Sequence, residues 1–472
     1  MDIAQSCPVT VPSFWLRLFF CFSFFISCEI SQAANNNLVP DSAPVTTSDK
    51  IPIIRVVAEN LTPLDIGLEI GKQSKALFTD IESRYDRYLM ASLSQIGFDD
   101  ILRNRLPRLR NSVEPGYQKE LEGIASSWSL IHENKLGDGF LSWDEYWLLN
   151  LLPDIGIPAN GVAFGVLGQL SSESGPAIGR NLNLKSSPEL RSLQAITVYE
   201  YDDNAVVNIG FAGIISVLTG FNGSGLFVAH FNAASSSSHQ NAYSGKKNAQ
   251  EAVKARGFVL RRALEAYTST RQATRFIAKK GTGFGGNTLV ADNTNIQVLE
   301  QSVSGKATIR RWNSPTHPSK PWDRVSQIAV VDCYASTTMP NNCRRAKDSY
   351  RWDRLRSLAG FSSSEKASVQ DIARIMLDDS NKYYEILGEN TIQSMIYLPG
   401  SGYLYLYAAP INSTGDRAGS AVNHPSYQVY YKDVMPSKLR NPSNKANYFW
   451  WIAGIVMLLM LSLWWVRRST TR

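Results

Sequence analysis

The stretch from residue 160 to 231 constrains the fold most, because its pattern predicts a block of consecutive β-strands. Short polar segments at 172–176 and 201–204 are rich in the residues that turns require. Between them, residues 196–200 are enriched in β-branched and aromatic side chains, which suit a packed pleated surface. We therefore expect antiparallel strands joined by short turns at the centre of the molecule.

Helical patterns lie on both sides of this block. Apolar residues recur at spacings of three and four over 66–89, and capping-box patterns at 269–272 and 368–371 precede two further helices. Two hairpins are predicted at 288–300 and 394–407. Strands in a block, then helices, then more strands favour an α+β fold in which helices cover antiparallel sheets.

The N-terminus has the features of a secretory signal. Residues 14–27 are a short apolar run, and the small residues at 31–34 form a cleavage pattern. We predict a signal peptide over 1–33 and a flexible start over 34–50. An uncleaved anchor is the alternative, since Arg17 interrupts the apolar run.

The C-terminus predicts a single transmembrane helix over 447–466. The run from 448 to 466 is uncharged, carries paired tryptophans near both ends and is followed by two arginines. Its length matches a hydrocarbon core of about 30 Å. We expect a stalk over 416–446, a cytoplasmic tail over 467–472 and an extracytoplasmic domain that is periplasmic, extracellular or lumenal.

Cysteine, charge and histidine patterns narrow the function. Three of the five cysteines fall in the targeting segment, and Cys333 and Cys343 could close a small loop in an oxidising compartment or remain free thiols. The net charge of +7 is spread without a basic stripe, so no nucleic-acid partner is expected. The five histidines lack metal-ligand spacing, and we expect neither metal nor cofactor.

Residues 134–145 partly fit a calcium-binding loop. Leu136 stands where an oxygen ligand is needed, and the sequence holds no second copy to pair with it. We therefore predict that this segment is the entry to a helix.

Eight modest motifs in order along residues 60–410 carry a family resemblance. The segments are 64–71, 117–125, 141–150, 179–181, 229–232, 285–287, Glu300, and 391–395 with 409–410. Together they resemble the N-terminal-nucleophile hydrolases, in the branch of the acyl-CoA:isopenicillin N acyltransferases and linear-amide hydrolases. Phospholipase B-like proteins and acid ceramidases are more distant relatives. The resemblance implies a four-layer αββα core over 161–415, preceded by a helical pro-segment-like region over 51–160.

The resemblance also implies a catalytic frame. In such enzymes the chain cleaves itself before a Cys, Ser or Thr, whose side chain becomes the nucleophile and whose free α-amine is the base. An arginine and a nearby acid position that amine, and an asparagine on a neighbouring strand stabilises the oxyanion. The matching residues here are Arg180, Asn181, Asn232 and Asn287.

Two parts of that frame are missing. The nucleophile is expected directly after residue 161, where the sequence has Val162 and Ala163, and neither side chain can attack a carbonyl. Asn183 stands where the family pattern has Asp, and an amide cannot hold a positive amine as a carboxylate does. A scaffold that keeps its frame but loses nucleophile and acid resembles a pseudoenzyme.

We therefore expect a membrane-anchored, extracytoplasmic domain whose hydrolase or acyltransferase chemistry is degenerate and which binds an acyl or amide small molecule. One alternative is an active amide or acyl-ester hydrolase with a non-standard nucleophile. Another is an adhesion or scaffold ectodomain.

Overall fold

The computed structural model describes most of the chain between residues 51 and 429. The described ranges are 51–130, 132–185, 187–233, 254–281, 285–302, 305–343, 346–362, 364–380, 385–408 and 426–429. The predicted signal peptide (1–33), flexible start (34–50), transmembrane helix (447–466) and tail (467–472) lie outside these ranges. Within them, no helix is both long and apolar enough to span a membrane.

Two sheets form the centre of the molecule. The larger has the order β1-β4-β5-β6-β7-β8-β9-β10, antiparallel except that β1 runs parallel to β4. Its strands are β1 (Ile53–Val57), β4 (Gln194–Glu200), β5 (Ala205–Phe211), β6 (Thr219–Asn222), β7 (Phe227–Asn232), β8 (Gly286–Ala291), β9 (Ile296–Gln301) and β10 (Ala307–Arg310).

The smaller sheet is antiparallel throughout and has the order β11-β2-β3-β12-β13-β14. Its strands are β11 (Gln327–Val330), β2 (Asn160–Val166), β3 (Ala177–Asn183), β12 (Thr391–Leu398), β13 (Tyr403–Ala408) and β14 (Ser426–Val429). β14 falls inside the segment 416–446 that the sequence assigns to a stalk, and here it forms the edge of this sheet.

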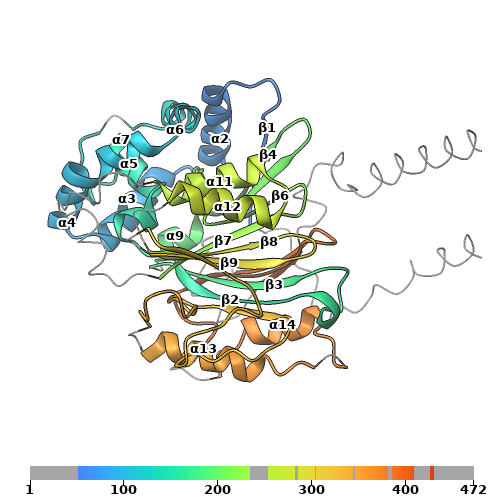
Figure 1. Cartoon of the computed structure of the whole chain (residues 1–472). Coiled ribbons are helices and arrows are strands. Elements are labelled where there is room, and N and C mark those ends of the chain that lie inside the picture. Colours follow the sequence, from blue (N-terminus) through green and yellow to red (C-terminus); the bar gives the residue numbers. More distant parts are fainter. Residues whose placement is uncertain are drawn as a thin grey trace, which may run out of the picture. The chain divides into compact units, whose positions relative to one another are not determined.

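Helices cover the outer face of each sheet (Figure 1). α11 (Arg256–Ala266) and α12 (Thr270–Lys280) pack on the larger sheet, and α13 (Ala346–Leu358) and α14 (Val369–Met376) pack on the smaller one. A third apolar cluster fills the space between the two sheets. The predicted α+β class, with two stacked sheets between helical layers, is therefore observed.

Residues 51–160 are mostly helical, as the sequence predicts. The helices are α2 (Pro63–Leu77), α3 (Ile81–Ser92), α4 (Gln95–Asp100), α5 (Leu106–Ser112), α6 (Pro115–Ser127), α7 (Trp143–Leu149) and α8 (Leu152–Ile155), with a π-helical turn at Ile101–Arg105. A 3-10 turn (Gly168–Leu170) and α9 (Pro188–Ser192) lie further along the chain.

Glycines allow α2 and α6 to cross closely. A Cβ atom added to Gly67 would lie 2.0 Å from the backbone oxygen of Glu120, and one added to Gly123 would lie 2.2 Å from that of Leu64. Both distances are far inside van der Waals contact, so only glycine fits at either position. This explains two glycines in the motifs that the sequence singled out.

The predicted capping signals are present. Ser269 accepts the N–H of Gln272 at the start of α12, and Ser368 with Asp371 forms a capping box at the start of α14. Ser142 does the same with Glu145 at the start of α7. The segment 134–145 is thus a helix entry, as predicted.

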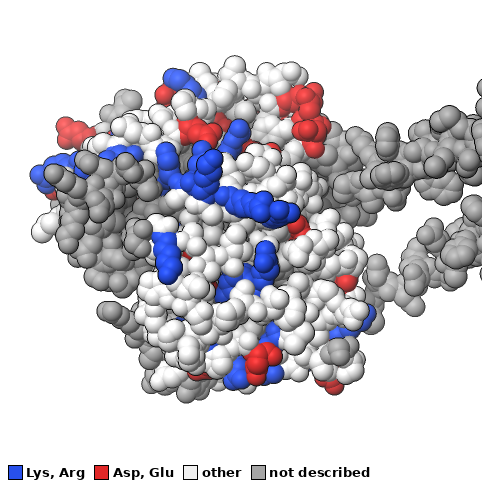
Figure 2. All heavy atoms as spheres, in the orientation of Figure 1, with Lys and Arg blue, Asp and Glu red and all other residues white. Residues whose placement is uncertain are grey.

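Basic residues line the exposed side of helix α12. Figure 2 shows Lys and Arg side chains over the region where Figure 1 draws α11 and α12. On α12, Arg271, Arg275, Lys279 and Lys280 are all exposed to solvent.

Candidate functional site at the head of strand β2

The two predicted nucleophile positions lie on opposite faces of β2. Ala163 pairs with Arg180 and packs between the two sheets, whereas Val162 pairs with Asn181 and packs against the α13 and α14 layer. Both side chains are fully buried. Only Ala163 therefore shares a face with Arg180, and it offers only a methyl group there. Gly161, two residues before Ala163 at the N-terminal end of β2, lies on the same face and has no side chain that could act as a nucleophile.

Arg180 is a buried cation with unused donors. Its Nη2 donates to the backbone oxygen of His230 at 2.7 Å, and its guanidinium lies 4.9 Å from the ring centroid of Phe231. Among the described residues, Nε and Nη1 have no hydrogen-bond partner. Burial lowers the pKa of Arg180 to about 9, against the opposing effect of the Asp332 carboxylate. Arg180 thus stays charged at neutral pH and has two donors to offer.

Asn232, the last residue of β7 in the larger sheet, bonds to Ala159, which directly precedes β2 of the smaller sheet. Its Oδ1 accepts the N–H of Ala159 at 2.9 Å, and its own N–H donates to the oxygen of Ala159 at 2.9 Å. Its Nδ2 has no partner among the described residues. Arg180 therefore contacts the end of β7, whose last residue is Asn232, beside the N-terminal end of β2.

Asp332 is a site residue that the sequence did not reveal. Its Oδ1 accepts the N–H of Gly161 at 2.8 Å, and its Oδ2 lies 3.6 Å from Nη1 of Arg351 on α13. The backbone pairing of β11 with β2 ends at Val330 and Ala163. Beyond that pair, the N–H of Gly161 donates to the Asp332 carboxylate instead of to a strand carbonyl. No local motif marks Asp332, because 171 residues separate it from Gly161.

Asn287 positions the Asp332 segment. Its Nδ2 donates to the backbone oxygens of Val331 at 3.0 Å and Cys333 at 2.8 Å, which flank Asp332. Cys333 is also joined to Cys343 by a disulfide, so this pair forms the loop that the sequence allowed. Asn287 therefore acts on the head of β2 through Asp332, because both of its N–H bonds are occupied by the backbone.

Glu300, the last single residue in the family motifs, holds the same loop. It is fully buried and accepts Nε of Arg310 at 2.7 Å. Its two oxygens also accept the N–H groups of Ala335 at 3.1 Å and Ser336 at 3.0 Å. A buried ion pair and two backbone bonds thus fix the chain that follows Asp332.

Asn181 and Asn183 are turned away from Arg180. The Nδ2 of Asn181 donates to the oxygens of Met376 at 2.7 Å and Ile386 at 2.9 Å, which ties the sheet to its helical layer. Asn183 accepts the hydroxyl of Thr391 at 2.8 Å. The structure therefore divides the predicted frame, with Arg180 and Asn232 on one side of β2 and β3, and Asn181 and Asn183 on the other.

A polar cavity of about 400 Å³ opens at the head of β2. Its lining combines amides, acids and bases from β2, β3, the Asp332 segment and α13. The lining residues are Pro158, Asn160, Asn183, Leu184, Lys185, Asp332, Asp348, Arg351, Glu385, Gly388 and Asn390. This composition suits a compact polar ligand better than a long hydrocarbon chain.

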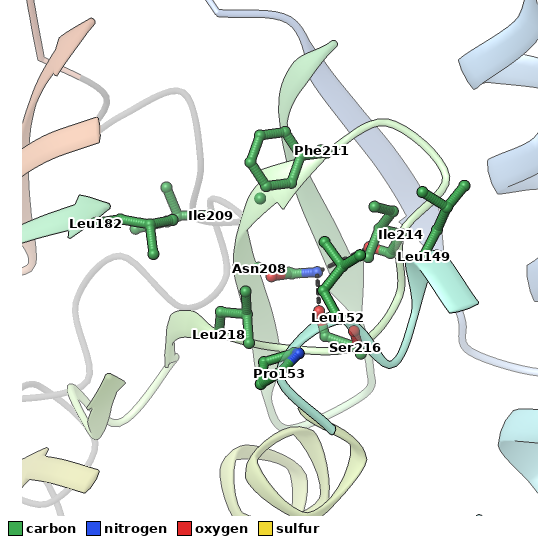
Figure 3. Close-up of a pocket in the computed structure, with 11 residues that line it drawn as sticks. Leu149, Leu152, Pro153, Leu182, Asn208, Ile209, Phe211, Ile214, Ser216 and Leu218 are labelled. Atoms are coloured by element: carbon green, nitrogen blue, oxygen red, sulfur yellow. Dashed lines mark hydrogen bonds between the residues drawn. The ribbon is translucent and has the colours of Figure 1, made fainter. Parts of the chain in front are cut away.

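A second cavity, between α7, α8 and strand β5, is far smaller (Figure 3). Its volume is about 10 Å³, which is close to the space of a single water molecule. Asn208 is its main polar group and donates from Nδ2 to the oxygens of Ile214 at 3.0 Å and Ser216 at 3.3 Å. The side chains around it are otherwise mostly apolar, so it is a packing defect of the core rather than a ligand site.

Behind the head of β2 lies a set of buried ionisable groups. Burial raises the pKa of Asp154 to about 7, opposed by the Arg256 guanidinium. Burial also lowers the pKa of His230 well below its ordinary value, and the charges of Arg256 and Arg180 add to this effect. His230 is therefore neutral at physiological pH and is a poor proton donor for chemistry at this site.

Solved structures of several enzymes match parts of this chain. An N-acylethanolamine-hydrolyzing acid amidase ortholog from Caenorhabditis elegans has 13% identity, covers 51% of this chain and 93% of its own, and gives a TM-score of 0.36. A mutant conjugated bile acid hydrolase from Clostridium perfringens has 13% identity, coverage of 59% and 94%, and a TM-score of 0.37. Penicillin V acylase from Agrobacterium tumefaciens has 11% identity, coverage of 54% and 86%, and a TM-score of 0.32.

No protein-family model matches the sequence, and no curated protein matches it. At such low identities and TM-scores, function has to be argued from the residues of this chain.

Proposed function

We propose that this protein is a membrane-anchored, extracytoplasmic relative of the N-terminal-nucleophile hydrolases that has lost their chemistry and binds a small acyl or amide compound. The observation that supports this proposal most directly is the identity of the side chains at the N-terminal end of β2. The side chain that faces Arg180 is the methyl group of Ala163, and Val162 is a buried hydrocarbon on the opposite face. Neither can form the ester or thioester through which such enzymes cleave themselves and their substrates.

The arrangement around this head supports a continuous chain. Ala159 and Gly161 each give their N–H to a side-chain oxygen, of Asn232 and Asp332 respectively. The hydroxyl of Thr391, at the Asn183 end of the cavity, is fully buried and already donates to Asn183. We therefore expect the chain to stay whole across residues 155–170.

Intact-mass analysis of the purified protein tests this expectation directly. A single species is expected. Two fragments of about 14 and 31 kDa, estimated for residues 34–161 and 162–446 at a typical residue mass, would overturn the proposal.

Ligand binding is tested by thermal unfolding in the presence of N-acyl amino acids, which carry an amide and a charged group together. A midpoint that rises with concentration is expected, because a ligand that binds only the folded state stabilises it. Asn183→Leu, which removes an amide from the cavity lining, should abolish the rise. Release of free amine from these compounds by the unaltered protein would instead support the alternative, an active hydrolase.

Membrane anchoring is tested by truncation after Asn447. The shortened protein should be released in soluble form, because the uncharged run with its paired tryptophans would be gone. Retention in the membrane fraction would show that another segment, such as the N-terminal apolar run, holds the protein there.

A further inference from the structure

The dipeptide of Asn160 and Gly161 lies at the head of β2 with a carboxylate against its peptide nitrogen. Asp332 Oδ1 is 2.8 Å from the nitrogen of Gly161. Gly161 has a φ of 143°, a region that side-chain-bearing residues rarely adopt, and it carries no Cβ to shield its nitrogen. The nitrogen that joins the two residues is thus held against a proton acceptor.

The Asn160 side chain, whose Cγ that nitrogen would attack, borders the polar cavity. It lines the polar cavity and is only partly buried, so water can reach it. Its amide has no hydrogen-bond partner among the described residues, whereas the buried side chains of Asn181 and Asn287 each donate two hydrogen bonds to backbone oxygens. Nothing in the described structure therefore holds the Asn160 amide away from the nitrogen of Gly161.

We propose that Asn160 is a site of self-modification, in which Asp332 promotes its conversion to aspartate or isoaspartate. The nitrogen of Gly161 attacks Cγ of Asn160 while Asp332 takes its proton. The bond from Cγ to Nδ2 breaks, and Nδ2 leaves as ammonia with that proton, which gives a five-membered succinimide. One water molecule then opens the ring and the acid that forms gives its proton to the ammonia, so the net change is asparagine plus water to a carboxylate plus ammonium.

The same dipeptide could react in another direction, and the structure distinguishes the two. If Nδ2 of Asn160 attacked its own backbone carbonyl, the bond to Gly161 would break and the nitrogen of Gly161 would have to gain a proton. A carboxylate that accepts the N–H of Gly161 removes a proton from that nitrogen instead. Asp332 therefore favours ring closure with loss of ammonia and leaves the chain intact.

The chain contains its own control in Asn222 and Gly223, the second of its two Asn-Gly dipeptides. There Nδ2 of Asn222 donates to the oxygens of Leu264 and Tyr267, both at 2.8 Å, and the side chain is almost fully buried. The N–H of Gly223 donates to a backbone oxygen, that of Ala205, at 2.9 Å.

Asn222 is held on its oxygen as well. Its Oδ1 accepts the N–H groups of Ser224 and Leu226, both at 3.1 Å. An amide fixed by four bonds cannot turn toward the next nitrogen. Among the described residues, the N–H of Gly223 donates to the oxygen of Ala205 and to the amide Oδ1 of Asn204 at 3.2 Å, and no carboxylate accepts it. We therefore expect Asn222 to stay unmodified in the folded protein.

The modification would place a negative charge in the polar cavity. A carboxylate at residue 160 would stand opposite Asn183, its partner in the β2–β3 ladder, and would share the cavity with Arg351. The acid that the sequence lacks at residue 183 would thus be supplied from the neighbouring strand.

The test is peptide mapping of the full-length protein after incubation at neutral pH in heavy-oxygen water. We expect a mass gain of about 1 Da from the exchange of amide for carboxylate, and additional heavy oxygen from ring opening, at Asn160 and not at Asn222. In urea, where neither fold nor base is present, the two sites should react at equal rates.

Asp332→Asn keeps the shape of the side chain but removes the base. It should slow the reaction at Asn160 by about 100-fold, at the lower end of what a positioned base contributes. Asp323→Asn, at an exposed ion pair with Arg356, should leave the rate unchanged. Rates measured in urea give the rate of modification of Asn160 in the unfolded chain, which serves as the reference for a variant that folds poorly. Equal rates for Asp332→Asn and the unaltered protein would overturn the proposal.

Other outcomes also decide the matter. An unmodified Asn160 in the native protein overturns this proposal and leaves the proposed loss of hydrolase chemistry untouched. Cleavage between Asn160 and Gly161 would overturn both.

Discussion

The buried carboxyl of Asp154, beside Arg256, should make the free energy of unfolding depend on pH. Burial raises its pKa from 3.8 to about 7, so the folded protein binds a proton at this site where the unfolded chain does not. A raised pKa contributes stability that is fully present below the unfolded value and is lost as pH rises through the folded value. The free energy of unfolding of the unaltered protein should therefore fall as pH rises from mildly acidic to mildly alkaline values.

The magnitude follows from the two pKa values. Between about pH 5 and pH 8, a shift from 3.8 to about 7 predicts a loss of about 2–3 kcal/mol in the free energy of unfolding. Asp154→Asn keeps an oxygen that can accept the N–H of Arg256, which now bonds Oδ2 at 3.0 Å, but it cannot ionise. The loss should disappear in this variant.

The assay is urea unfolding of both proteins at the two pH values. The difference in unfolding free energy between Asp154→Asn and the unaltered protein should shift by about 2–3 kcal/mol in favour of the variant as pH rises. Asp371→Asn is the matched control. Its pKa is lowered with help from bonds to Ser368, so its contribution is lost only as pH falls below the ordinary range of a carboxyl. A difference that does not change with pH for Asp154→Asn would refute the assigned burial effect.

Two further predictions concern the head of β2. Val162→Cys combined with Asn183→Asp puts a thiol and an acid on the face of β2 and β3 that is turned away from Arg180, so the chain should stay whole on gels. Cleavage before residue 162 in the double variant would contradict this register. Asn287→Ala leaves the carbonyls of Val331 and Cys333 without their donor, and should lower the free energy of unfolding by about 2–4 kcal/mol in urea titrations. A loss below about 0.5 kcal/mol would show that the loop is held by its other bonds.

Much of the local structure follows from the sequence alone. The turns near 172–176 and 201–204 separate strands, and the capping patterns at 269–272 and 368–371 begin helices where expected. These signals are readable because they depend on residues within a few positions of each other. The absence of a thiol or hydroxyl at residues 162 and 163 is equally a property of the sequence.

The partners of the site residues depended on tertiary structure. Asp332 meets Gly161 only because β11 pairs with β2 and then ends, and Asn287 acts on the same loop from the other sheet. The register of β2 against β3 likewise decides that Val162 and Arg180 lie on opposite faces of the smaller sheet.

The sequence by itself determined the strands, the helix starts and the absence of a thiol or hydroxyl at residues 162 and 163, because each of these rests on short-range spacing or on residue identity. The tertiary structure alone decided which carboxylate lies against which peptide nitrogen and where a polar cavity opens. The physical reason is that such contacts form between strands far apart along the chain, and their geometry is set by the packing of two sheets rather than by any local pattern.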